Sequence, residues 1–565
     1  MVNMDSQRLT AWLWLGIVLT SVVLVNTLGQ RYFRRIDLTE EGRYSISDPT
    51  KRMLRELEDV VYVDVYLDGD MPAGFERLKR SIRETLEEFR VHAGTRIQYQ
   101  FIDPWAGPSG NARQEFFRDL GQKGLQPINV VDDNGDQTTE KYLVPGAVIS
   151  YAGSEIGVML LQTSLTASPD EQLNQSVEGV EYALASTIGK LTAVERKTVG
   201  ILRGHGELSG LNITGVVSPL EEFYNMVPVQ ASATKEFQSL DALIVAKPVE
   251  AFTEQEKYNL DQYLMQGGKV FMALDLMEVY MDSAGGEGTA SIPYNLNLED
   301  QLFRYGLRIN YDLVGDAQSG YYPAVVSEAG GQPQIRQMPW PFFVLANNYA
   351  SHPITNNLDV LYHRFVSTID TVAVEGVKKT LLIQSSPYSK VMGSPVRVNI
   401  NDMRGLLDEK SFNAGPQAVG YLLEGSFPSL YKNRLLPEGI NDPDYLSESS
   451  GDAKLVVVAD GDILKNDVNP RSGEPLPLGM DPFSQQQYAN SDFLLNTMAY
   501  LLEADGIINA RNKEIAIRPL DEVKVANERA NWQFINLALP LLVLIAFGAG
   551  KWILRKRTFG RSRQQ

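Results

Sequence analysis

Cysteine is absent from the 565-residue chain. Without thiols the chain cannot form disulfide scaffolds, thiolate zinc sites, iron–sulfur clusters or cysteine nucleophiles. Histidine is scarce, with four residues, so histidine-rich metal sites are disfavoured and we expect neither a metal nor a cofactor. The phosphate loop G-x-x-x-x-G-K-[ST], the nucleophile elbow G-x-S-x-G and the zinc motif H-E-x-x-H are also missing. We therefore predict that the chain does not hydrolyse ATP and is not an enzyme.

Positive charge is in the minority, and the formal net charge is −18. A nucleic-acid-binding protein normally carries a basic surface, so we expect no nucleic-acid partner. Hydrophobic residues make up 44% and charged residues 22% of the chain, as in ordinary globular proteins. This balance excludes a disordered chain, a fibrous repeat and a transporter with many spans.

Long hydrophobic runs occur only near the two termini, at 11–28 and 532–554. Both are long enough for a helix that spans the lipid bilayer, and Trp532 and Trp552 stand at the edges of the second run, where interfacial tryptophans are expected. No small-residue cleavage site follows the first run, so we predict an uncleaved anchor rather than a signal peptide. We expect spans at 10–28 and 532–554; two buried core helices are the weaker alternative.

Positive charge after the second run indicates the orientation in the membrane. From Lys551 onward there are six Lys and Arg residues and no acid, so the basic tail 555–565 is expected in the cytoplasm. Two spans then place the tail 1–9 there as well, and the bulk of the chain in the periplasm, outside a bacterial inner membrane. The arginines after the first run oppose this orientation. The segment 29–531 carries −24, which should repel anionic lipid headgroups.

Residues 29–192 have the pattern of a small α/β domain. Segments rich in β-branched, aromatic and hydrophobic residues predict strands at 60–67, 97–102, 129–131, 147–151 and 156–161. Hydrophobic residues at helical spacing predict helices through 75–89 and 173–191. Asp48 as an N-cap, followed by Pro49, predicts the start of another helix, earlier in the chain. The order of these elements suits a thioredoxin-like domain.

Residues 193–505 have the pattern of a larger α/β domain with a parallel sheet. Hydrophobic runs predict buried strands at 197–202, 240–245, 269–274 and 454–460. Thr253 and Glu256 have the spacing of a capping box at the start of a helix, which Gly267 and Gly268 end. Strand–helix–strand units with short loops favour parallel pairing. Other expected features are a long insertion at about 276–416, a helix at 491–502 and a membrane-proximal linker at 506–531.

The sharpest local pattern is the loop Arg203-Gly204-His205-Gly206-Glu207, which directly follows the first of these strands. Ligands of open α/β sheets bind beyond the carboxyl ends of the strands, and two glycines let the backbone approach a ligand closely. His205 and Glu207 have the chemistry of a base and an acid, or of metal ligands. The alternative is a tight turn in which His205 satisfies local carbonyl groups.

Three further residues are candidates for ligand or partner binding. Asp275 and Asp460 end neighbouring strands and could converge on His205, although acids are common at strand ends. Trp340 lies between two prolines, where its ring could serve as a platform for a partner or ligand. An aromatic plug over the sheet edge is an equal alternative for Trp340. We assign no catalytic residue.

A series of short motifs lies in order between the two terminal runs. They are RYSIS at 43–47, VYLDGDMPAGF at 65–75, GHGE at 204–207, FTEQEK at 252–257, GGK at 267–269, MPWP at 338–341, HPIT at 352–355 and DGD at 460–462. Together they resemble the GldG family, the gliding-motility-associated ABC transporter auxiliary proteins of Bacteroidetes, which are often called substrate-binding.

The resemblance implies a membrane-anchored, non-catalytic accessory subunit of an ABC complex. Its partners would be a permease, a separate ATPase and the lipid bilayer, and its role would lie in gliding or in secretion of surface adhesins. The resemblance also implies that residues 193–505 are glutamine-amidotransferase-like or flavodoxin-like. Amidotransferases need a nucleophilic cysteine, so the domain would be catalytically silent.

Two functional alternatives and one structural question stay open. The first alternative is a solute receptor with a pocket near His205 or Trp340. The second is a cell-envelope hydrolase that uses His205 and Glu207. Whether the chain forms a homo-oligomer is also open.

Overall fold

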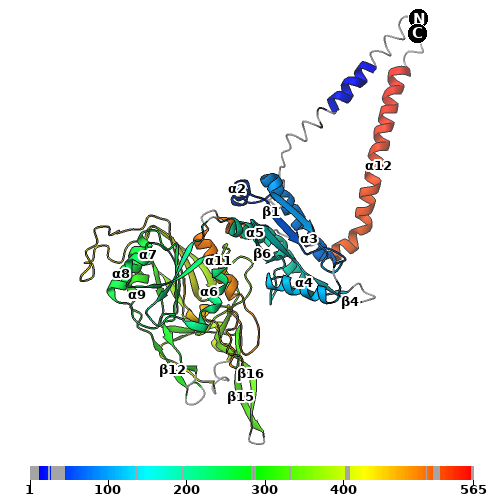
Figure 1. Cartoon of the computed structure of the whole chain (residues 1–565). Coiled ribbons are helices and arrows are strands. Elements are labelled where there is room, and N and C mark those ends of the chain that lie inside the picture. Colours follow the sequence, from blue (N-terminus) through cyan, green and yellow to red (C-terminus); the bar gives the residue numbers. More distant parts are fainter. Residues whose placement is uncertain are drawn as a thin grey trace. The chain divides into compact units, whose positions relative to one another are not determined.

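Most of the chain is described by the computed structural model, in two units. The described residues are 12–22, 24, 26, 45–107, 109–133, 138–193, 195–281, 284, 288–329, 332–400, 408–503, 506–512 and 522–560. The units are Met1–Glu514 and Ile515–Gln565. Every described sheet belongs to the first unit, and the second contains one long helix (Figure 1).

The N-terminal part of the first unit is built around a four-stranded sheet with the order β2-β1-β5-β6. Its strands are β1 (Val61–Val65), β2 (Ile97–Phe101), β5 (Gly146–Tyr151) and β6 (Ser154–Met159). β1 and β2 are parallel and are connected through helix α3 (Ala73–Ala93), whereas β5 pairs antiparallel with β1 and with β6. Helix α5 (Pro169–Thr192) follows β6. These strands and helices were expected from the sequence.

The core of this part forms because each element buries one face. The residues of α3 that recur at helical spacing are all buried, namely Phe75, Leu78, Ile82, Leu86 and Phe89. They belong to one hydrophobic cluster with residues of β1 and α5, including Val63, Val65, Leu184 and Ile188. The hydrophobic stripes of the sequence therefore serve packing in this part of the chain.

One local prediction in this part is corrected. Helix α2 (Asp48–Glu56) has Ser47 as its N-cap rather than Asp48, because the Ser47 hydroxyl accepts the N–H of Thr50 at 3.4 Å. The predicted strand at 129–131 is confirmed as part of β3 (Ile128–Asp133), which pairs with β4 (Thr138–Leu143) in a separate two-stranded sheet. Helix α4 (Asn111–Gln122) was not predicted; Leu120 is its one buried residue, so it lacks a wide hydrophobic stripe.

The larger part of the first unit is built around an eight-stranded sheet with the order β17-β20-β23-β24-β10-β9-β7-β8. Its strands are β7 (Thr198–Arg203), β8 (Asn225–Gln230), β9 (Ala242–Ala246), β10 (Lys269–Ala273), β17 (Asn348–Tyr349), β20 (Val377–Gln384), β23 (Ala418–Gly425) and β24 (Ala453–Val458). The five strands from β24 to β8 are parallel, and antiparallel pairs add β23, β20 and β17. The segment 276–416 is therefore more than an insertion, because it supplies β17 and β20.

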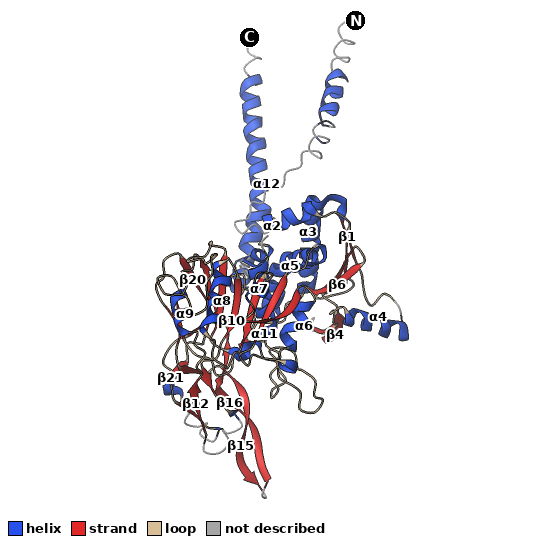
Figure 2. Ribbon diagram, turned by 60° about the vertical axis from the view of Figure 1, so that its left-hand side comes forward, coloured by secondary structure: helices blue, strands red, loops and turns tan. Residues whose placement is uncertain are grey.

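Helices cover both faces of this sheet (Figures 1 and 2). Successive strand residues point to opposite faces. Ile244 accordingly packs in one hydrophobic cluster with helices α6 (Thr214–Glu221) and α11 (Asn490–Leu502). Its neighbour Leu243 packs in another cluster with α8 (Glu254–Met265) and α9 (Glu299–Tyr305). Strands buried on both faces need near-continuous hydrophobic runs, which is why these strands were recognisable in the sequence.

The remaining elements are short, apart from one ribbon. The strands are β11 (Met277–Glu278), β12 (Thr289–Pro293), β13 (Leu307–Ile309), β14 (Asp312–Asp316), β15 (Ser319–Ala329), β16 (Gln332–Ala346), β18 (Leu361–Tyr362), β19 (Ile369–Thr371), β21 (Ser389–Gly393) and β22 (Val396–Val398). The short helical segments are η1 (Gly94–Arg96), η2 (Gly210–Asn212), α7 (Thr234–Phe237), η5 (Glu409–Ser411), η6 (Gly461–Leu464) and η7 (Ile507–Asn512). β15 and β16 form a long two-stranded ribbon that extends away from the eight-stranded sheet (Figure 2).

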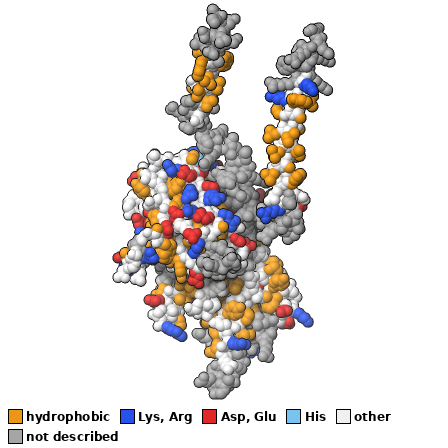
Figure 3. Space-filling view, turned by 90° about the vertical axis from the view of Figure 1, so that its right-hand side faces the viewer, with side chains coloured by type: hydrophobic (Ala, Val, Ile, Leu, Met, Phe, Trp, Pro, Cys, Tyr) orange, Lys and Arg blue, Asp and Glu red, His pale blue; other side chains and the backbone are white. Residues whose placement is uncertain are grey.

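The second unit contains helix α12 (Glu522–Gly560). Its segment Asn531–Leu554 has 24 residues and a mean hydropathy of 2.1, so it is long and apolar enough to cross a membrane. Hydrophobic side chains follow this helix, with Lys and Arg at its ends (Figure 3). Near the N-terminus, an apolar helix over Trp12–Val22 is shorter than a span, and most other residues of the predicted span 10–28 lie outside the described residues. Of the two predicted spans, the described residues contain one candidate.

Candidate functional site

Four parallel strands of the eight-stranded sheet end at the same edge, and a polar residue follows each of them. The loops after β7, β9, β10 and β24 carry His205, Lys247, Asp275 and Asp460. In open α/β sheets, ligands bind beyond the carboxyl ends of the strands. These four loops therefore form the candidate site.

The loop after β7 turns tightly because two glycines adopt backbone conformations that other residues avoid. Gly204 has a φ of 122° and Gly206 a φ of 72°. A Cβ atom on Gly206 would lie 2.5 Å from Cγ2 of Val249. The carbonyl of His205 accepts the N–H groups of Val249 and Glu250 at 2.8 and 3.0 Å. The loop is thus held against the segment that follows β9.

His205 is 3% exposed, and both of its ring nitrogens face carboxylates. Nδ1 lies 3.2 Å from Oε1 of Glu207, and Nε2 lies 3.2 Å from Oε2 of Glu256. The backbone N–H of His205 also donates to Oε2 of Glu207, at 2.8 Å. The imidazole stacks on the ring of Phe252, with centroids 3.6 Å apart and planes 13° from parallel. We call His205, Glu207 and Glu256 the His205 brace.

The contacts of the His205 brace favour a charged imidazolium. Burial alone would lower the pKa of His205, but hydrogen bonding and attraction to Glu207 and Glu256 outweigh burial and raise it. Burial alone would raise the pKa values of both carboxyl groups. The partners of each group lower them instead, namely His205 for Glu207, and Thr253 together with His205 for Glu256. The brace therefore favours the charged form of His205 between two carboxylates.

Glu256 links the brace to the start of helix α8. Oε2 of Glu256 accepts the backbone N–H of Thr253 at 2.9 Å, and the Thr253 hydroxyl accepts the N–H of Glu256 at 3.3 Å. This reciprocal arrangement is the predicted capping box. One carboxylate thus caps the helix and also pairs with His205.

Lys247, Asp275 and Asp462 form a second buried cluster, the Lys247 triad. Nζ of Lys247 lies 2.8 Å from Oδ2 of Asp275 and 2.5 Å from Oδ1 of Asp462. Asp275 also accepts the backbone N–H of Gly461. Lys247 has a φ of 53°, in the left-handed region that residues other than glycine rarely occupy. The fold holds this residue in an unfavourable backbone conformation with its ammonium group between two carboxyl groups.

In the Lys247 triad, one ammonium group pairs with two carboxyl groups. The pKa values of these two carboxyl groups shift in opposite directions. Burial raises the pKa of Asp275 to about 7; Lys247 opposes this shift, and the charges of Asp462 and Asp460 add to it. Burial also acts against a charge on Asp462, but attraction to Lys247 lowers its pKa overall. The two carboxylates in turn raise the pKa of Lys247 in spite of its burial. Of the two carboxyl groups, Asp275 therefore has the higher pKa.

Asp460 is fully buried and organises the loop after β24. Its Oδ1 accepts the N–H of Asp462 at 2.8 Å, and its Oδ2 accepts the N–H of Arg364 at 3.1 Å. Oδ2 also lies 2.9 Å from Nδ1 of His363. The guanidinium of Arg364 pairs with both carboxylate oxygens of Asp467. Protein groups thus occupy both oxygens of Asp460, which gives this residue a role in positioning the loop.

The predicted site residues fall into two groups at this edge. His205 and Glu207 meet in the His205 brace, and Arg203 donates to the carbonyl of Leu208 within the same loop. Asp275 and Asp460 lie close enough to influence each other's charge and are organised around the Lys247 triad rather than around His205. The contacts of Asp275 and Asp460 thus place them at and beside the Lys247 triad, and their convergence on His205 stays a prediction.

Trp340 belongs to strand β16 and is fully buried. Its ring packs 5.8 Å from that of Tyr322 and 5.4 Å from that of Phe342, within a separate hydrophobic cluster. This packing favours the aromatic-plug alternative. Its use as a binding platform stays a prediction.

Sequence reasoning missed three members of these clusters, Lys247, Glu256 and Asp462, and also His363, which contacts Asp460. The sequence contains a signal for Lys247, because this residue follows a predicted buried strand, as Asp275 does. Glu256 was recognised for its capping pattern, but nothing local indicates that it meets His205, which lies in a different strand–loop unit. Within the described part of the chain, no group of three or more His, Asp or Glu side chains is arranged to hold a metal ion.

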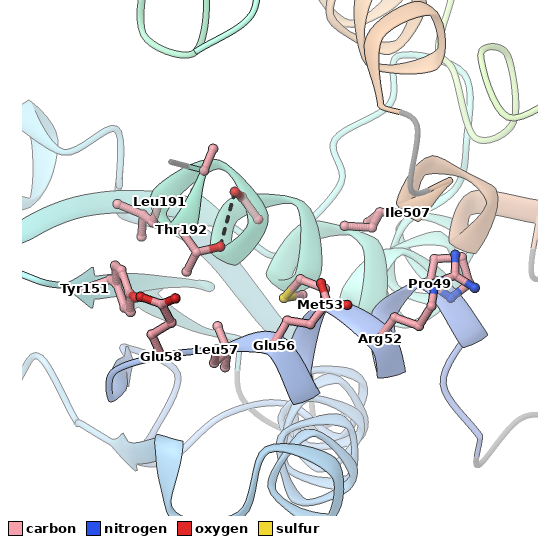
Figure 4. Close-up of a pocket in the computed structure, with 12 residues that line it drawn as sticks. Pro49, Arg52, Met53, Glu56, Leu57, Glu58, Tyr151, Leu191, Thr192 and Ile507 are labelled. Atoms are coloured by element: carbon pink, nitrogen blue, oxygen red, sulfur yellow. Dashed lines mark hydrogen bonds between the residues drawn. The ribbon is translucent and has the colours of Figure 1, made fainter. Parts of the chain in front are cut away.

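A cavity of about 600 Å³ lies in the N-terminal part of the first unit. Figure 4 shows residues of α2 such as Arg52 and Glu56 on one side, and Tyr151, Thr192 and Ile507 around the rest. This volume is within the range of small-molecule sites. The predicted site residues do not line it, so it is separate from the loops at the sheet edge.

The fold and the sheet edge define an α/β protein whose buried charged residues pair with one another. The chain belongs to the ABC-type uncharacterized transport system family, whose model matches residues 196–497, more than half of the chain and all of the eight-stranded sheet. Membership indicates a non-catalytic, auxiliary role in an ABC transport system, with permease and ATPase partners in general. A candidate membrane helix accords with this role.

Other comparisons found further similar sequences and a structure. Residues 40–150 match a domain of unknown function, DUF7088. An uncharacterized protein of Borreliella burgdorferi is 20% identical over 544 residues, which cover 93% of this chain and 94% of that protein. Among solved structures, the mmIFT52 N-terminal domain is 13% identical and aligns over 54% of this chain and 97% of its own, with a TM-score of 0.30. The GldG resemblance itself stays a prediction.

Proposed function

We propose that the chain is a membrane-anchored, non-catalytic accessory subunit of an ABC transporter complex, which binds a partner or ligand outside the cytoplasmic membrane. The observation that carries this proposal is the family match over residues 196–497. Because the sequence lacks a phosphate-binding loop, a separate ATPase subunit supplies ATP hydrolysis and a permease subunit supplies the pathway.

The contacts of His205 support a non-catalytic role for the sheet edge. A general base needs a ring nitrogen within reach of the proton that it removes. Both ring nitrogens of His205 instead face carboxylates, and the ring is stacked on Phe252. The brace therefore fixes the loop after β7 against helix α8, an arrangement that suits a rigid partner-binding surface better than a hydrolase.

The proposal includes two domains and a topology. Residues 29–192 form a thioredoxin-like domain, supported by the sheet order β2-β1-β5-β6, and residues 193–505 form a silent amidotransferase-like domain, supported by its parallel strands. Both termini lie in the cytoplasm and the bulk of the chain in the periplasm, supported by the basic tail. From the GldG resemblance we propose that the complex acts in gliding motility or in secretion of surface adhesins.

The test is co-purification from native membranes. The full chain, tagged after residue 565, is extracted in a mild detergent and purified, and associated proteins are quantified by mass spectrometry; untagged cells give the background. We expect a permease and an ATPase in near-stoichiometric amounts. Recovery of the chain without either protein, in two detergents and after crosslinking in the membrane, would overturn the accessory role.

A further inference from the structure

The ribbon of β15 and β16 is a surface that the proposed function leaves unused. The two strands pair over most of their length, and β16 also pairs with β18 at Leu345 and Ala346. Among the described residues, these are the only strand partners of either strand. A two-stranded ribbon is marginally stable by itself. An extended ribbon of this kind therefore needs packing on at least one face.

One face of the ribbon carries three exposed hydrophobic side chains, beside the exposed side chain of Gln337, which donates to the carbonyl of Phe483 at 2.8 Å. The directly opposed pairs Tyr321–Pro339, Pro323–Gln337 and Val325–Ile335 lie on the same face, because opposed residues share a face and successive residues alternate. Tyr321, Val325 and Ile335 are 44%, 56% and 65% exposed.

The other face of the ribbon packs on the body of the unit. Tyr322 lies 5.0 Å from the ring of Phe483, and Ala324 is 6% exposed. Met338 joins the same hydrophobic cluster. The face with the three exposed hydrophobic side chains is thus the outer face of a ribbon whose inner face is already occupied.

Prolines protect the edges of the ribbon against an added strand. A hydrogen-bonded antiparallel pair needs an N–H group from both residues. Pro323 and Pro339 have none, so their pairs are of the non-hydrogen-bonded kind and their backbone nitrogens point outward. Each edge therefore lacks a donor that a docking strand would use. Contact through the exposed face is favoured over extension of the sheet.

Charge favours an uncharged occupant for this face, such as the same patch on a second copy of the chain. The segment 29–531 carries −24, so two copies of the chain repel each other over most of their surfaces. Within residues 319–346 there is one acid, Glu328, and one base, Arg336, so this segment is neutral. A twofold contact places the same patch on both copies, and an uncharged apolar patch is self-complementary. We propose that two copies of the chain associate through the ribbon face formed by Tyr321, Val325 and Ile335.

The test uses the absence of cysteine, since a single introduced cysteine has no background. Val325→Cys and Ile335→Cys are made in the full chain and oxidised in native membranes. Leu435→Cys is the matched control, because Leu435 is apolar, 94% exposed and outside the ribbon. We expect at least one ribbon variant to form a covalent dimer about tenfold faster than the control, because the contact raises the local thiol concentration.

A second measurement keeps the proposal independent of crosslinking geometry. The double variant V325E/I335E adds charge at exposed positions, so it should keep the wild-type melting temperature. We expect the purified wild-type chain to have the mass of a dimer by light scattering in detergent, and the variant that of a monomer. A monomeric wild-type chain, equal masses for both proteins, or ribbon cysteines that crosslink only to a different protein would each overturn self-association.

Discussion

His205 and His352 are both buried, but their neighbours favour opposite charge states. His205 lies between two carboxylates that raise its pKa. Nδ1 of His352 instead accepts the backbone N–H of Ile354 at 3.3 Å, and burial lowers the pKa of His352 to about 4. The two residues therefore contribute to stability with opposite dependence on pH.

The variant His205→Gln tests the charge of the brace. The folded-state pKa of His205 lies above its ordinary value of 6.5, so its stabilisation is complete below about pH 6.5 and is lost as the pH rises through the folded-state pKa. Removing a buried cation from two carboxylates should cost about 3 kcal/mol below pH 6. We expect the unfolding midpoints in urea to differ most at pH 5.5 and to converge at high pH.

His352→Gln is the matched comparison. The folded-state pKa of His352 is below that of the unfolded chain, so the wild-type chain loses stability as the pH falls from about 6.5 toward 4. The variant has no imidazole to protonate, so it should not lose this stability as the pH falls. If His205→Gln instead destabilised the chain equally from pH 5.5 to 9, the assignment of a positive charge to His205 in the brace would be wrong.

At the scale of elements, helix α8 begins with a carboxylate that has two tasks. Glu256 closes the capping box with Thr253 and pairs with His205, whereas Glu171 closes an equivalent box with Ser168 at the start of α5. Glutamine can replace glutamate in a capping box. The substitution therefore removes the charge and keeps the cap.

Glu256→Gln should destabilise the chain by about 1–2 kcal/mol, because it weakens a charge-assisted hydrogen bond to His205. Glu171→Gln should cost only a few tenths of a kcal/mol, because it changes an exposed cap. Melting temperatures of the two full-length variants give the comparison. Equal losses would show that Glu256 acts through its cap alone.

Elements with a local signal were predictable from the sequence, and long-range pairings were not. The strand at 269–274 and the Thr253–Glu256 box were identified because continuous burial and helix capping leave local patterns. Strand β20 joins the sheet through β23, and no local pattern specifies that pairing. The same limit applies to the site: Glu207 lies two residues from His205, but Glu256 reaches it only through the fold.

At the scale of the whole molecule, charge is unevenly distributed along the chain. The segment 29–531 carries −24, and the residues after it carry six positive charges. Helix α12 contains an apolar stretch long enough to cross a membrane between these two regions. An acidic body and a basic tail separated by a span are expected on opposite sides of the bilayer. The number of spans then decides where the N-terminus lies.

Cysteine labelling distinguishes one span from two. Ser6→Cys, Leu435→Cys and Ser562→Cys are made separately in the full chain, which has no other thiol. Intact cells are treated with a maleimide that crosses the outer membrane but not the inner one. With two spans, we expect Leu435→Cys to be labelled in intact cells, and the other two only after lysis, because positively charged tails stay in the cytoplasm. Labelling of both Leu435→Cys and Ser6→Cys in intact cells would leave α12 as the single span, and labelling of Ser562→Cys alone would reverse the orientation.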